Sequence, residues 1–241
     1  MHLSSLIALF SAPLLAASSP LSSFSPPSSS SLSEIEPRQV YGVTSKYCST
    51  ASGNVPSLCF LQYYISATAP TFRIALPSDA TNNAAYDTIL QIISPITQTW
   101  VGFAWGGGMT NNPLTVAWPN GNSGQVSVSS RWSAGRTTPG IYSSATLRTL
   151  STVRNSTHWT VEVVCTGCSK WNSQQNGGRL ETQAGSASTF AWAISRTAVP
   201  QPSNPSGSFP VHNNQGMFSN ALDFGKNTRA TFTQYVQNKR S

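Results

Sequence analysis

The stretch WVGFAWGGGMTNNPLTVAW, residues 100–118, places two apolar runs on either side of a glycine corner. Runs this rich in Val, Phe and Trp are typical of buried β-strands, and successive glycines allow positive φ angles and close approach of the backbone. Met109 follows the corner directly, so two strands would hold its thioether at a fixed place. Most methionines fill gaps in a core. The stretch therefore predicts two strands joined by a turn, with Met109 either as packing or as a ligand.

The rest of the chain repeats short β-rich runs between clusters of Asn, Gly and Pro. Within two of these runs, Trp159 to Cys165 and Phe190 to Ile194, every second residue is apolar, which is typical of a strand with one buried face. This spacing favours an all-β fold, an antiparallel β-sandwich. We expect one short helix at Thr228–Gln237 and strands at Cys59–Ser66, Thr71–Leu76, Tyr86–Ser94, Trp100–Trp105, Leu114–Trp118, Gln125–Ser130, Trp159–Cys165 and Phe190–Ala198.

The amino-terminal segment has the features of a secreted chain. Residues 1–18 combine an apolar run with a small-residue cleavage site and are predicted to be a signal peptide. Residues 19–38 are rich in Ser and Pro and are expected to be disordered. The folded domain should then span residues 39–241. No run is long enough to span a bilayer. We therefore expect a secreted, extracellular monomer without a transmembrane anchor.

The charge pattern argues against nucleic-acid binding. The chain has 14 Lys and Arg against 7 Asp and Glu, a net charge of +7, and only 9% of its residues are charged. Nucleic-acid binding needs a clustered basic footprint, whereas these basic residues are scattered. A dispersed positive field instead favours acidic partners or surfaces.

Four cysteines and one sequon fit the secreted context. Proximity in sequence favours disulfides Cys48–Cys59 and Cys165–Cys168, and the first would contribute about 3 kcal/mol in the chain-entropy model. A redox-active C-x-x-C and a four-cysteine zinc site are the alternatives, although no βαβ pattern surrounds the motif and a secreted chain oxidises its thiols. The sequon at Asn155 predicts a glycosylated surface turn.

Few residues are available for chemistry after Gln39. No motif pairs two carboxylates as a glycosidase requires, and no nucleophile elbow, P-loop or dinucleotide fingerprint occurs. Outside the signal segment the histidines are His158 and His212, too few for a typical zinc or copper site. An imidazole and a thioether can together fill both axial positions of one haem iron. The candidates are His158 or His212 with Met109 or Met217, and the haem would be non-covalent because no C-x-x-C-H motif is present.

Several segments together carry a family resemblance. They occur in the order WVGFAWGGGMTNNPLTVAW, SSRWSAGRTTPGIY, NSTHW, CTGCSKWN, FAWAIS and FPVHNNQGMF. This set resembles the cytochrome domain of fungal cellobiose dehydrogenase, a secreted b-type haem domain of the iron-reductase, DOMON-like class, from about Tyr41 to the carboxyl terminus. The resemblance implies an immunoglobulin-like, DOMON-like β-sandwich with a haem pocket at one end.

The resemblance also implies roles for individual residues. Met109 and His212 correspond to the axial ligands of haem b, and His158 does not correspond to a ligand. The Cys165–Cys168 pair corresponds to a disulfide of that family. Arg136 stands where the family often has a tyrosine that bonds a haem propionate, and we expect the arginine to pair with the propionate directly.

The function that follows is single-electron transfer. We expect a redox carrier rather than a catalyst, because the flavin dehydrogenase portion of the family's typical enzyme has no counterpart in this sequence. Expected donors are an extracellular flavodehydrogenase, a quinol or small quinones, and expected acceptors are a copper polysaccharide monooxygenase or Fe(III), in the setting of lignocellulose degradation. The alternative is a haem-free carbohydrate-binding module that uses some of the 7 tryptophans as stacking platforms.

Overall fold

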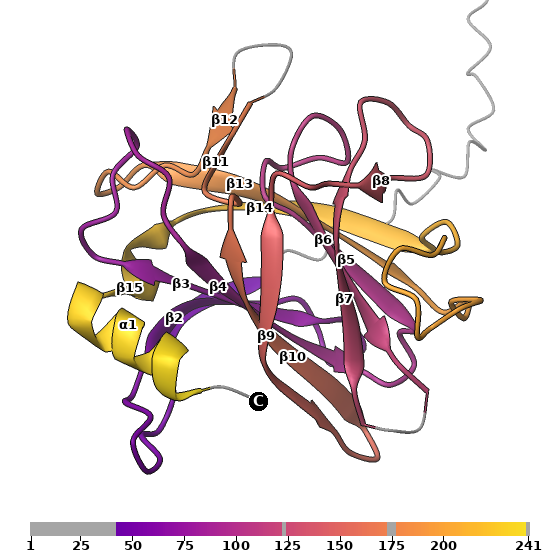
Figure 1. The fold of residues 1–241 in the computed structure, drawn as a ribbon, viewed down its shortest axis with the longest axis horizontal. Helices are drawn as coiled ribbons and strands as arrows, with labels where there is room; N and C mark the ends of the chain where they lie inside the picture. The colour runs from indigo at the N-terminus through magenta and orange to yellow at the C-terminus, as the bar shows by residue number, and fades with distance from the viewer. Residues whose placement is uncertain (1–41, 122–123, 173–176, 240–241) are drawn as a thin grey trace, which may run out of the picture. The chain divides into compact units, whose positions relative to one another are not determined.

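Two β-sheets, packed face to face, form the body of the folded domain (Figure 1). The computed structural model describes residues 42–121, 124–172 and 177–239. The predicted signal peptide (residues 1–18) and the whole of the predicted disordered segment (residues 19–38) lie outside the described residues. Residues 39–241 form one compact unit by their contacts.

The first sheet is seven-stranded and antiparallel along its main path. Each strand pairs antiparallel with its neighbours, from β1 paired with β2 to β10 paired with β9. A two-residue strand, β15 (Lys226–Asn227), pairs in parallel with β3 off this path. In spatial order the main strands are β1 (Val43–Cys48), β2 (Cys59–Tyr64), β3 (Thr71–Pro77), β4 (Thr88–Pro95), β10 (His158–Thr166) and β9 (Thr146–Arg154).

The second sheet is six-stranded and antiparallel throughout, and it carries the stretch from Trp100 to Trp118. Its central strands β5 and β6 are the two apolar runs on either side of the glycine corner. In spatial order the strands are β14 (Asn214–Ala221), β13 (Ala187–Ser195), β5 (Trp100–Ala104), β6 (Leu114–Pro119), β7 (Val126–Trp132) and β8 (Gly140–Ile141).

The main core lies between the two sheets, and aromatic rings fill its centre. Phe103 of β5 lies with its ring centroid 5.2 Å from Phe72 of β3 and 5.3 Å from Phe190 of β13. The alternating apolar residues of β10 belong to the same cluster. Because successive side chains of a strand point to opposite faces, the other residues of β5 and β13 face away from this core.

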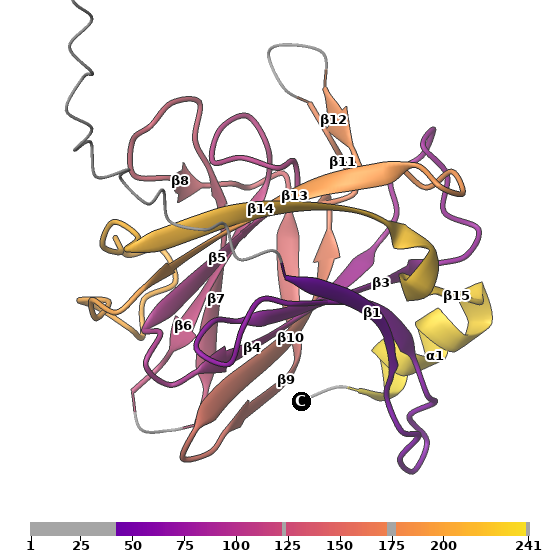
Figure 2. The ribbon, with the colours of Figure 1, turned by 180° about the vertical axis from the view of Figure 1, so that it is seen from behind.

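Shorter elements complete the fold. The hairpin of β11 (Lys170–Trp171) and β12 (Gly178–Arg179) stands apart from both sheets, and η1 (Leu222–Gly225) precedes β15. Helix α1 (Arg229–Asn238) begins at Thr228, whose hydroxyl accepts a hydrogen bond from Thr231 N at 3.2 Å. The helix lies beside β2, β3 and β15 (Figure 2) and packs Phe232 and Tyr235 into a second buried cluster.

The prediction of an all-β antiparallel sandwich is confirmed. Each predicted strand overlaps an observed one, and α1 lies within one residue of the predicted helix at both ends. The boundaries of four strands differ by two or three residues: β2 ends at Tyr64, β4 begins at Thr88, β7 ends at Trp132, and β13 begins at Ala187 and ends at Ser195. Among the described residues, seven observed strands were not predicted: the longer strands β1, β9 and β14, and the two-residue strands β8, β11, β12 and β15.

Candidate functional site

Small residues form a continuous floor on the outer face of the six-stranded sheet, the face turned away from the main core. Register places Ala104 of β5 opposite Ala191 of β13, and Gly102 opposite Ala193. The residues between them, such as Phe103, point into the core instead. With only methyl groups and a glycine here, this part of the face is low and apolar. We refer to these four residues as the small-residue floor.

Met109 lies in the loop of residues 105–113 that joins β5 to β6, and its side chain is half-buried. The loop closes with a hydrogen bond from Trp105 N to Pro113 O, 3.1 Å. Asn112 holds the loop from inside: its Oδ1 accepts from Gly106 N at 3.0 Å, and its Nδ2 donates to Gly108 O at 2.9 Å. Met109 therefore sits on a loop whose backbone is fixed on both sides of it.

Two backbone positions explain why the corner needs its particular residues. Asn111, with φ of 60°, is the one residue other than glycine with a positive φ among those that the structure describes. Its N donates to Ser133 O at 2.9 Å and its O accepts from Trp171 Nε1 at 3.1 Å. Gly107 also has a positive φ, 79°, and a Cβ there would lie 2.6 Å from Thr189. The strained conformation is thus held in place by its neighbours.

His212 lies two residues before β14, and its side chain is half-buried. Both of its chain neighbours are anchored to the end of β13. Asn213 N donates to Ile194 O at 2.8 Å, and Val211 O accepts from Ser195 Oγ at 3.3 Å. Asn213 Oδ1 in turn accepts from Arg196 N at 2.7 Å. The backbone of His212 is therefore positioned from both sides.

Arg131 of β7 fastens the long loop that precedes His212. Its Nη2 donates to Pro205 O at 2.7 Å and to Gly207 O, and its Nη1 donates to Pro139 O at 3.1 Å. The guanidinium also lies 5.3 Å from the ring of Phe209. Burial lowers the pKa of Arg131, and no carboxylate among the described residues pairs with it. One buried cation thus ties two loops to the sheet.

The remaining part of that loop lies on the outer face. Trp118 Nε1 donates to Pro202 O at 2.8 Å, and Ser129 Oγ donates to Pro205 O at 2.6 Å. Phe209 packs against Trp100 with a centroid distance of 5.1 Å. The segment from Pro202 to Phe209 consequently covers β6, β7 and the start of β5, and Ala193 of the small-residue floor packs against the same cluster.

Met109 and His212 come from loops at the two ends of this floor. Strands β5 and β14 run in the same direction on either side of β13, and both Val101 and Asn214 pair with Ile194. His212 therefore precedes β14 at the end where β5 begins, whereas Met109 follows the end of β5. One thioether and one imidazole are a donor set that would suit a haem iron, and the floor residues between the two loops are apolar.

The other residues singled out in the sequence take different places. Arg136 is exposed in the loop between β7 and β8. His158 begins β10 in the other sheet, where its Nδ1 lies 3.0 Å from Thr157 Oγ1. Met217 is 68% exposed and pairs with Ala191 across the outer face. Asn155 is exposed, and its Oδ1 accepts from Thr157 N at 2.9 Å.

Both expected disulfides are present, Cys48–Cys59 and Cys165–Cys168. No described cysteine is free, and the part of the chain that the structure describes holds no cluster of three or more His, Cys, Asp or Glu suited to a metal ion. The redox-active and zinc alternatives for the cysteines therefore gain no support from the geometry.

Sequence reasoning missed Arg131 and the small-residue floor. Arg131 was counted among scattered basic residues, although it follows Ser127 and Ser129 at alternate positions of one strand. The floor was visible as Gly102 and Ala104 within the 100–118 stretch and as alanines alternating with Phe190 and Trp192. In both strands the small residues recur at every second position. A search for alternating large apolar residues does not detect this pattern.

The comparison with known protein families is decisive at this point. The model of the family described as "Cytochrome domain of cellobiose dehydrogenase" matches residues 51–234. The chain belongs to this family. It is a family of extracellular fungal cytochrome domains that bind haem b and transfer electrons.

A curated relative matches most of this chain. A pyrroloquinoline quinone-dependent pyranose dehydrogenase of Coprinopsis cinerea is 28% identical over 186 residues, which are 76% of this chain and 24% of that protein. The chain thus spans about a quarter of the curated relative's length.

Two solved cytochrome domains share the fold. The cytochrome b domain of pyranose dehydrogenase from Coprinopsis cinerea matches with a TM-score of 0.65 and 24% identity, over 76% of this chain and 92% of that one. The cytochrome domain of Myriococcum thermophilum cellobiose dehydrogenase matches with a TM-score of 0.69 and 24% identity, over 84% and 98%. Within the described residues of the present cytochrome domain, no helix has the length and apolarity to cross a membrane.

Proposed function

We propose that this cytochrome domain transfers single electrons through a six-coordinate haem b held by Met109 and His212. The observation that carries the proposal is the placement of the thioether and the imidazole on anchored loops at the two ends of the small-residue floor. His158 lies in the other sheet and Met217 is largely exposed, so neither is as well placed.

The chain's own residues would perform three tasks around the haem. Met109 and His212 would hold the haem iron, and their anchored loops would limit reorganisation when the iron charge changes. Gly102, Ala104 and the facing alanines would supply an apolar surface that limits the access of water. When bound, haem supplies a reversible one-electron couple, and a doubly ligated iron offers no open position for oxygen. The proposed chemistry is therefore electron relay.

Arg136 is proposed to hold a haem propionate. The residue is exposed on the loop between β7 and β8, which begins at the same end of the sheet as the Met109 loop, and Asn111 N joins the two loops through Ser133 O at 2.9 Å. A guanidinium bonds a carboxylate with two parallel hydrogen bonds, which a tyrosine cannot do. Arg136→Ala should lower haem affinity or shift the reduction potential, and an unchanged value of both would remove this role.

The proposed partners follow from the family. The electron donor is an extracellular flavodehydrogenase, a quinol or a small quinone, and the acceptor is a copper polysaccharide monooxygenase or Fe(III). These partners are extracellular, which agrees with secretion of this chain. The proposal that the chain is secreted rests on the predicted signal peptide, the two disulfides and the exposed sequon.

Absorption spectroscopy of the protein, oxidised and then reduced with dithionite, tests the proposal. A sharp Soret band with resolved α and β bands after reduction is the expected result for a low-spin, six-coordinate iron. Met109→Ala and His212→Ala should each abolish this spectrum. His158→Ala and Met217→Ala are matched controls that should retain it. Retention in either ligand variant, or loss in a control, contradicts the assignment.

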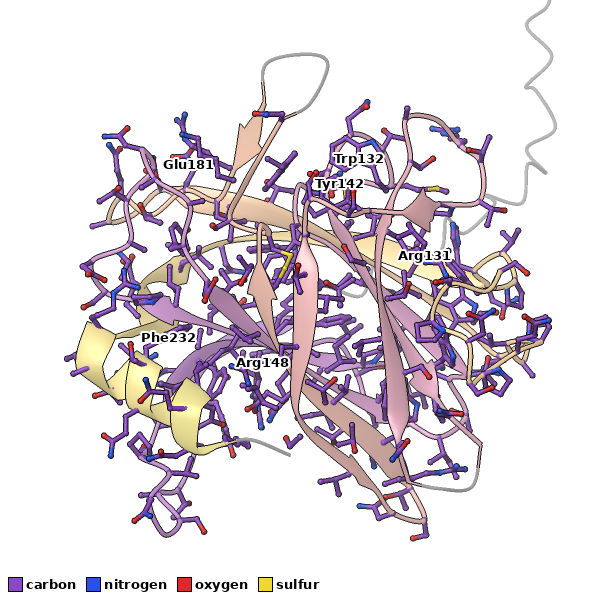
Figure 3. All side chains as sticks on the ribbon, in the orientation of Figure 1. Arg131, Trp132, Tyr142, Arg148, Glu181 and Phe232 are labelled. Carbon is purple, nitrogen blue, oxygen red and sulfur yellow. A yellow bond between two sulfur atoms is a disulfide. The ribbon has the colours of Figure 1, made fainter. Side chains whose placement is uncertain are left out.

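One observation favours the alternative, a carbohydrate-binding module. The stacked rings of Trp132 and Tyr142, 4.8 Å apart, lie side by side in Figure 3 and line a hollow of about 480 Å³ together with Trp171. The other tryptophans are buried, which limits stacking on sugars: Trp100, Trp105, Trp118, Trp159 and Trp192. A colourless protein that co-sediments with cellulose or chitin would favour this function over electron transfer.

A further inference from the structure

The position of Met109 depends on its neighbours, because its own backbone forms no hydrogen bond with any described residue. Asn112 Nδ2 donates to the two carbonyls that flank Met109, Gly108 O at 2.9 Å and Thr110 O at 2.8 Å. Asn111, with φ of 60°, lies between Thr110 and Asn112. The course of the chain through Met109 therefore depends on keeping Asn111 in this conformation.

A tryptophan from outside both sheets holds Asn111 in place. Trp171 Nε1 donates to Asn111 O at 3.1 Å, across a separation of 60 residues. On the other side Asn111 N donates to Ser133 O at 2.9 Å, at the end of β7. A left-handed backbone is costly for a residue with a side chain and persists where its surroundings fix it. Trp171 lies in the β11–β12 hairpin (Figure 1), so it supplies an anchor that the two sheets do not.

The indole of Trp171 fits into space that two glycines leave open, and the residue is 7% exposed. A Cβ on Gly106 would lie 2.8 Å from Cζ2 of the ring. A Cβ on Gly178, which pairs with Trp171 in the hairpin, would overlap with Cε2 and Nε1. The ring therefore packs against both the hairpin and the loop of Met109.

The hairpin that carries Trp171 is itself attached to the start of β4. Ser169 Oγ accepts from Tyr86 N at 2.8 Å and donates to Tyr86 O at 2.6 Å. The Cys165–Cys168 disulfide closes the turn between β10 and Ser169. Through Trp171 the loop of Met109 is thus connected to the first sheet.

We propose that Trp171 is a positioning residue for Met109, an inference that rests on the proposed haem ligation. Its indole N–H fixes Asn111 and so holds the Met109 thioether where it can bind the iron. A ligand that is already restrained loses less conformational freedom when it binds. A thioether ligand raises the reduction potential of a haem. Trp171 therefore strengthens the bond from Met109 and keeps the potential high.

Trp171→Phe tests the proposal, because it removes the N–H and keeps an aromatic ring. In the oxidised, haem-loaded protein, free imidazole competes with Met109 for the iron, and absorption spectra follow the exchange. The imidazole concentration at half-displacement should fall about fivefold, the effect of one hydrogen bond. The reduction potential should fall as well, because the thioether is held less firmly.

Trp159→Phe is the matched control. Trp159 Nε1 also donates to a backbone carbonyl, Gln98 O at 2.9 Å, and its indole is completely buried. Gln98 precedes β5 and the loop of Met109 follows β5, so the two bonds lie at opposite ends of this strand. The control should lose stability to a similar extent. It should leave the imidazole concentration within about twofold and the potential unchanged.

Gly178→Ala is a second test, and it leaves the indole intact. The added methyl group would overlap with the ring of Trp171 and displace it. The variant should show the same fall in imidazole concentration and in potential as Trp171→Phe. It tests the same role if Trp171→Phe does not fold.

A measurement on the apoprotein needs no haem. Exchange of the Asn111 amide hydrogen reports the opening of its bond to Ser133 O. Exchange should be about fivefold faster in Trp171→Phe and unchanged in Trp159→Phe. A protein that binds no haem overturns the proposed function and the role of Trp171 in ligation together. With haem bound, an unchanged imidazole concentration in Trp171→Phe overturns the role of Trp171 alone.

Discussion

The Nη2 of Arg131 donates to the carbonyl of Pro205 at 2.7 Å, which joins strand β7 to the loop that leads to His212. The same guanidinium donates from Nη1 to Pro139 O at 3.1 Å, in the loop that carries Arg136. A lysine in this place has one charged head and cannot contact both loops in a fork. Arg131 is therefore a positioning residue for two parts of the proposed haem site.

Arg131→Lys should destabilise the fold by about 3 kcal/mol, because buried carbonyl oxygens lose charged donors. It should also shift the haem reduction potential, since the loop before His212 loosens. Urea unfolding and a spectroelectrochemical titration measure the two effects. Ser127→Ala, which removes a single 2.7 Å bond to Pro202 O, is the control and should cost about 1 kcal/mol without a change in potential. An unchanged potential in Arg131→Lys would leave Arg131 a purely structural role.

The glycine corner permits a comparison of adjacent positions. Gly107 has a positive φ, and a Cβ there would meet Thr189 at 2.6 Å, whereas a Cβ at Gly108 would have nothing within 4 Å. Gly107→Ala should destabilise the apoprotein by about 2 kcal/mol through strain and the clash. Gly108→Ala should change apoprotein stability by less than about 0.5 kcal/mol. Thermal unfolding without haem checks both, and equal stability of the two variants would show that the corner is not constrained.

The three longer strands that were not predicted share a physical cause. β1 and β9 are the edges of the first sheet, and β14 is an edge of the second. Edge strands bury fewer side chains and carry polar residues that block pairing with other chains. In β9 only Leu150 is fully buried, and β14 reads NQGMFSNA, so neither shows the apolar alternation that marks a central strand. Central strands such as β5 and β10 lie between two other strands and bury most of their side chains. Their apolar residues therefore made them predictable from the sequence.

The candidate site was predictable only in part. Met109 stood out because it follows a glycine corner between two apolar runs. The candidate histidine ligand was either His158 or His212, because the chain has no other histidine outside the signal segment. Composition could not choose between the two histidines, because the choice depends on which sheet each one borders. The role of Arg131 depends on carbonyl groups of a loop some 70 residues later in the chain, with separations of 74 and 76. Contacts of that kind leave no local pattern.

Acid should weaken the fold through Asp223. A hydrogen bond from Lys226 lowers the pKa of Asp223 below its usual 3.8. Because the folded pKa is depressed, the unfolded chain binds the proton first, so this contribution is present above pH about 4 and is lost as pH falls through the folded pKa. Asp223→Asn should therefore flatten the dependence of the unfolding free energy on pH below about 4. Urea titrations at a series of pH values measure this slope, and an identical slope in the variant would exclude the contribution.

The carboxyl-terminal helix is attached to the sheet through the completely buried carboxylate of Glu162. Tyr235 donates its hydroxyl to Glu162 Oε1 at 2.9 Å, Lys239 Nζ lies 2.9 Å from the same oxygen, and Gln91 Nε2 donates to Oε2 at 2.6 Å. Burial and the Glu162 charge both raise the pKa of Tyr235, so its hydroxyl stays protonated and remains a donor. Tyr235→Phe should cost about 2 kcal/mol, the range for a hydrogen bond to a buried charge. Tyr64→Phe, on an exposed ring of β2, should cost less than about 0.5 kcal/mol. Because Glu162 lies in the first sheet, the haem spectrum should be the same in both variants, and a loss confined to stability would show that α1 supports the fold independently of the redox site.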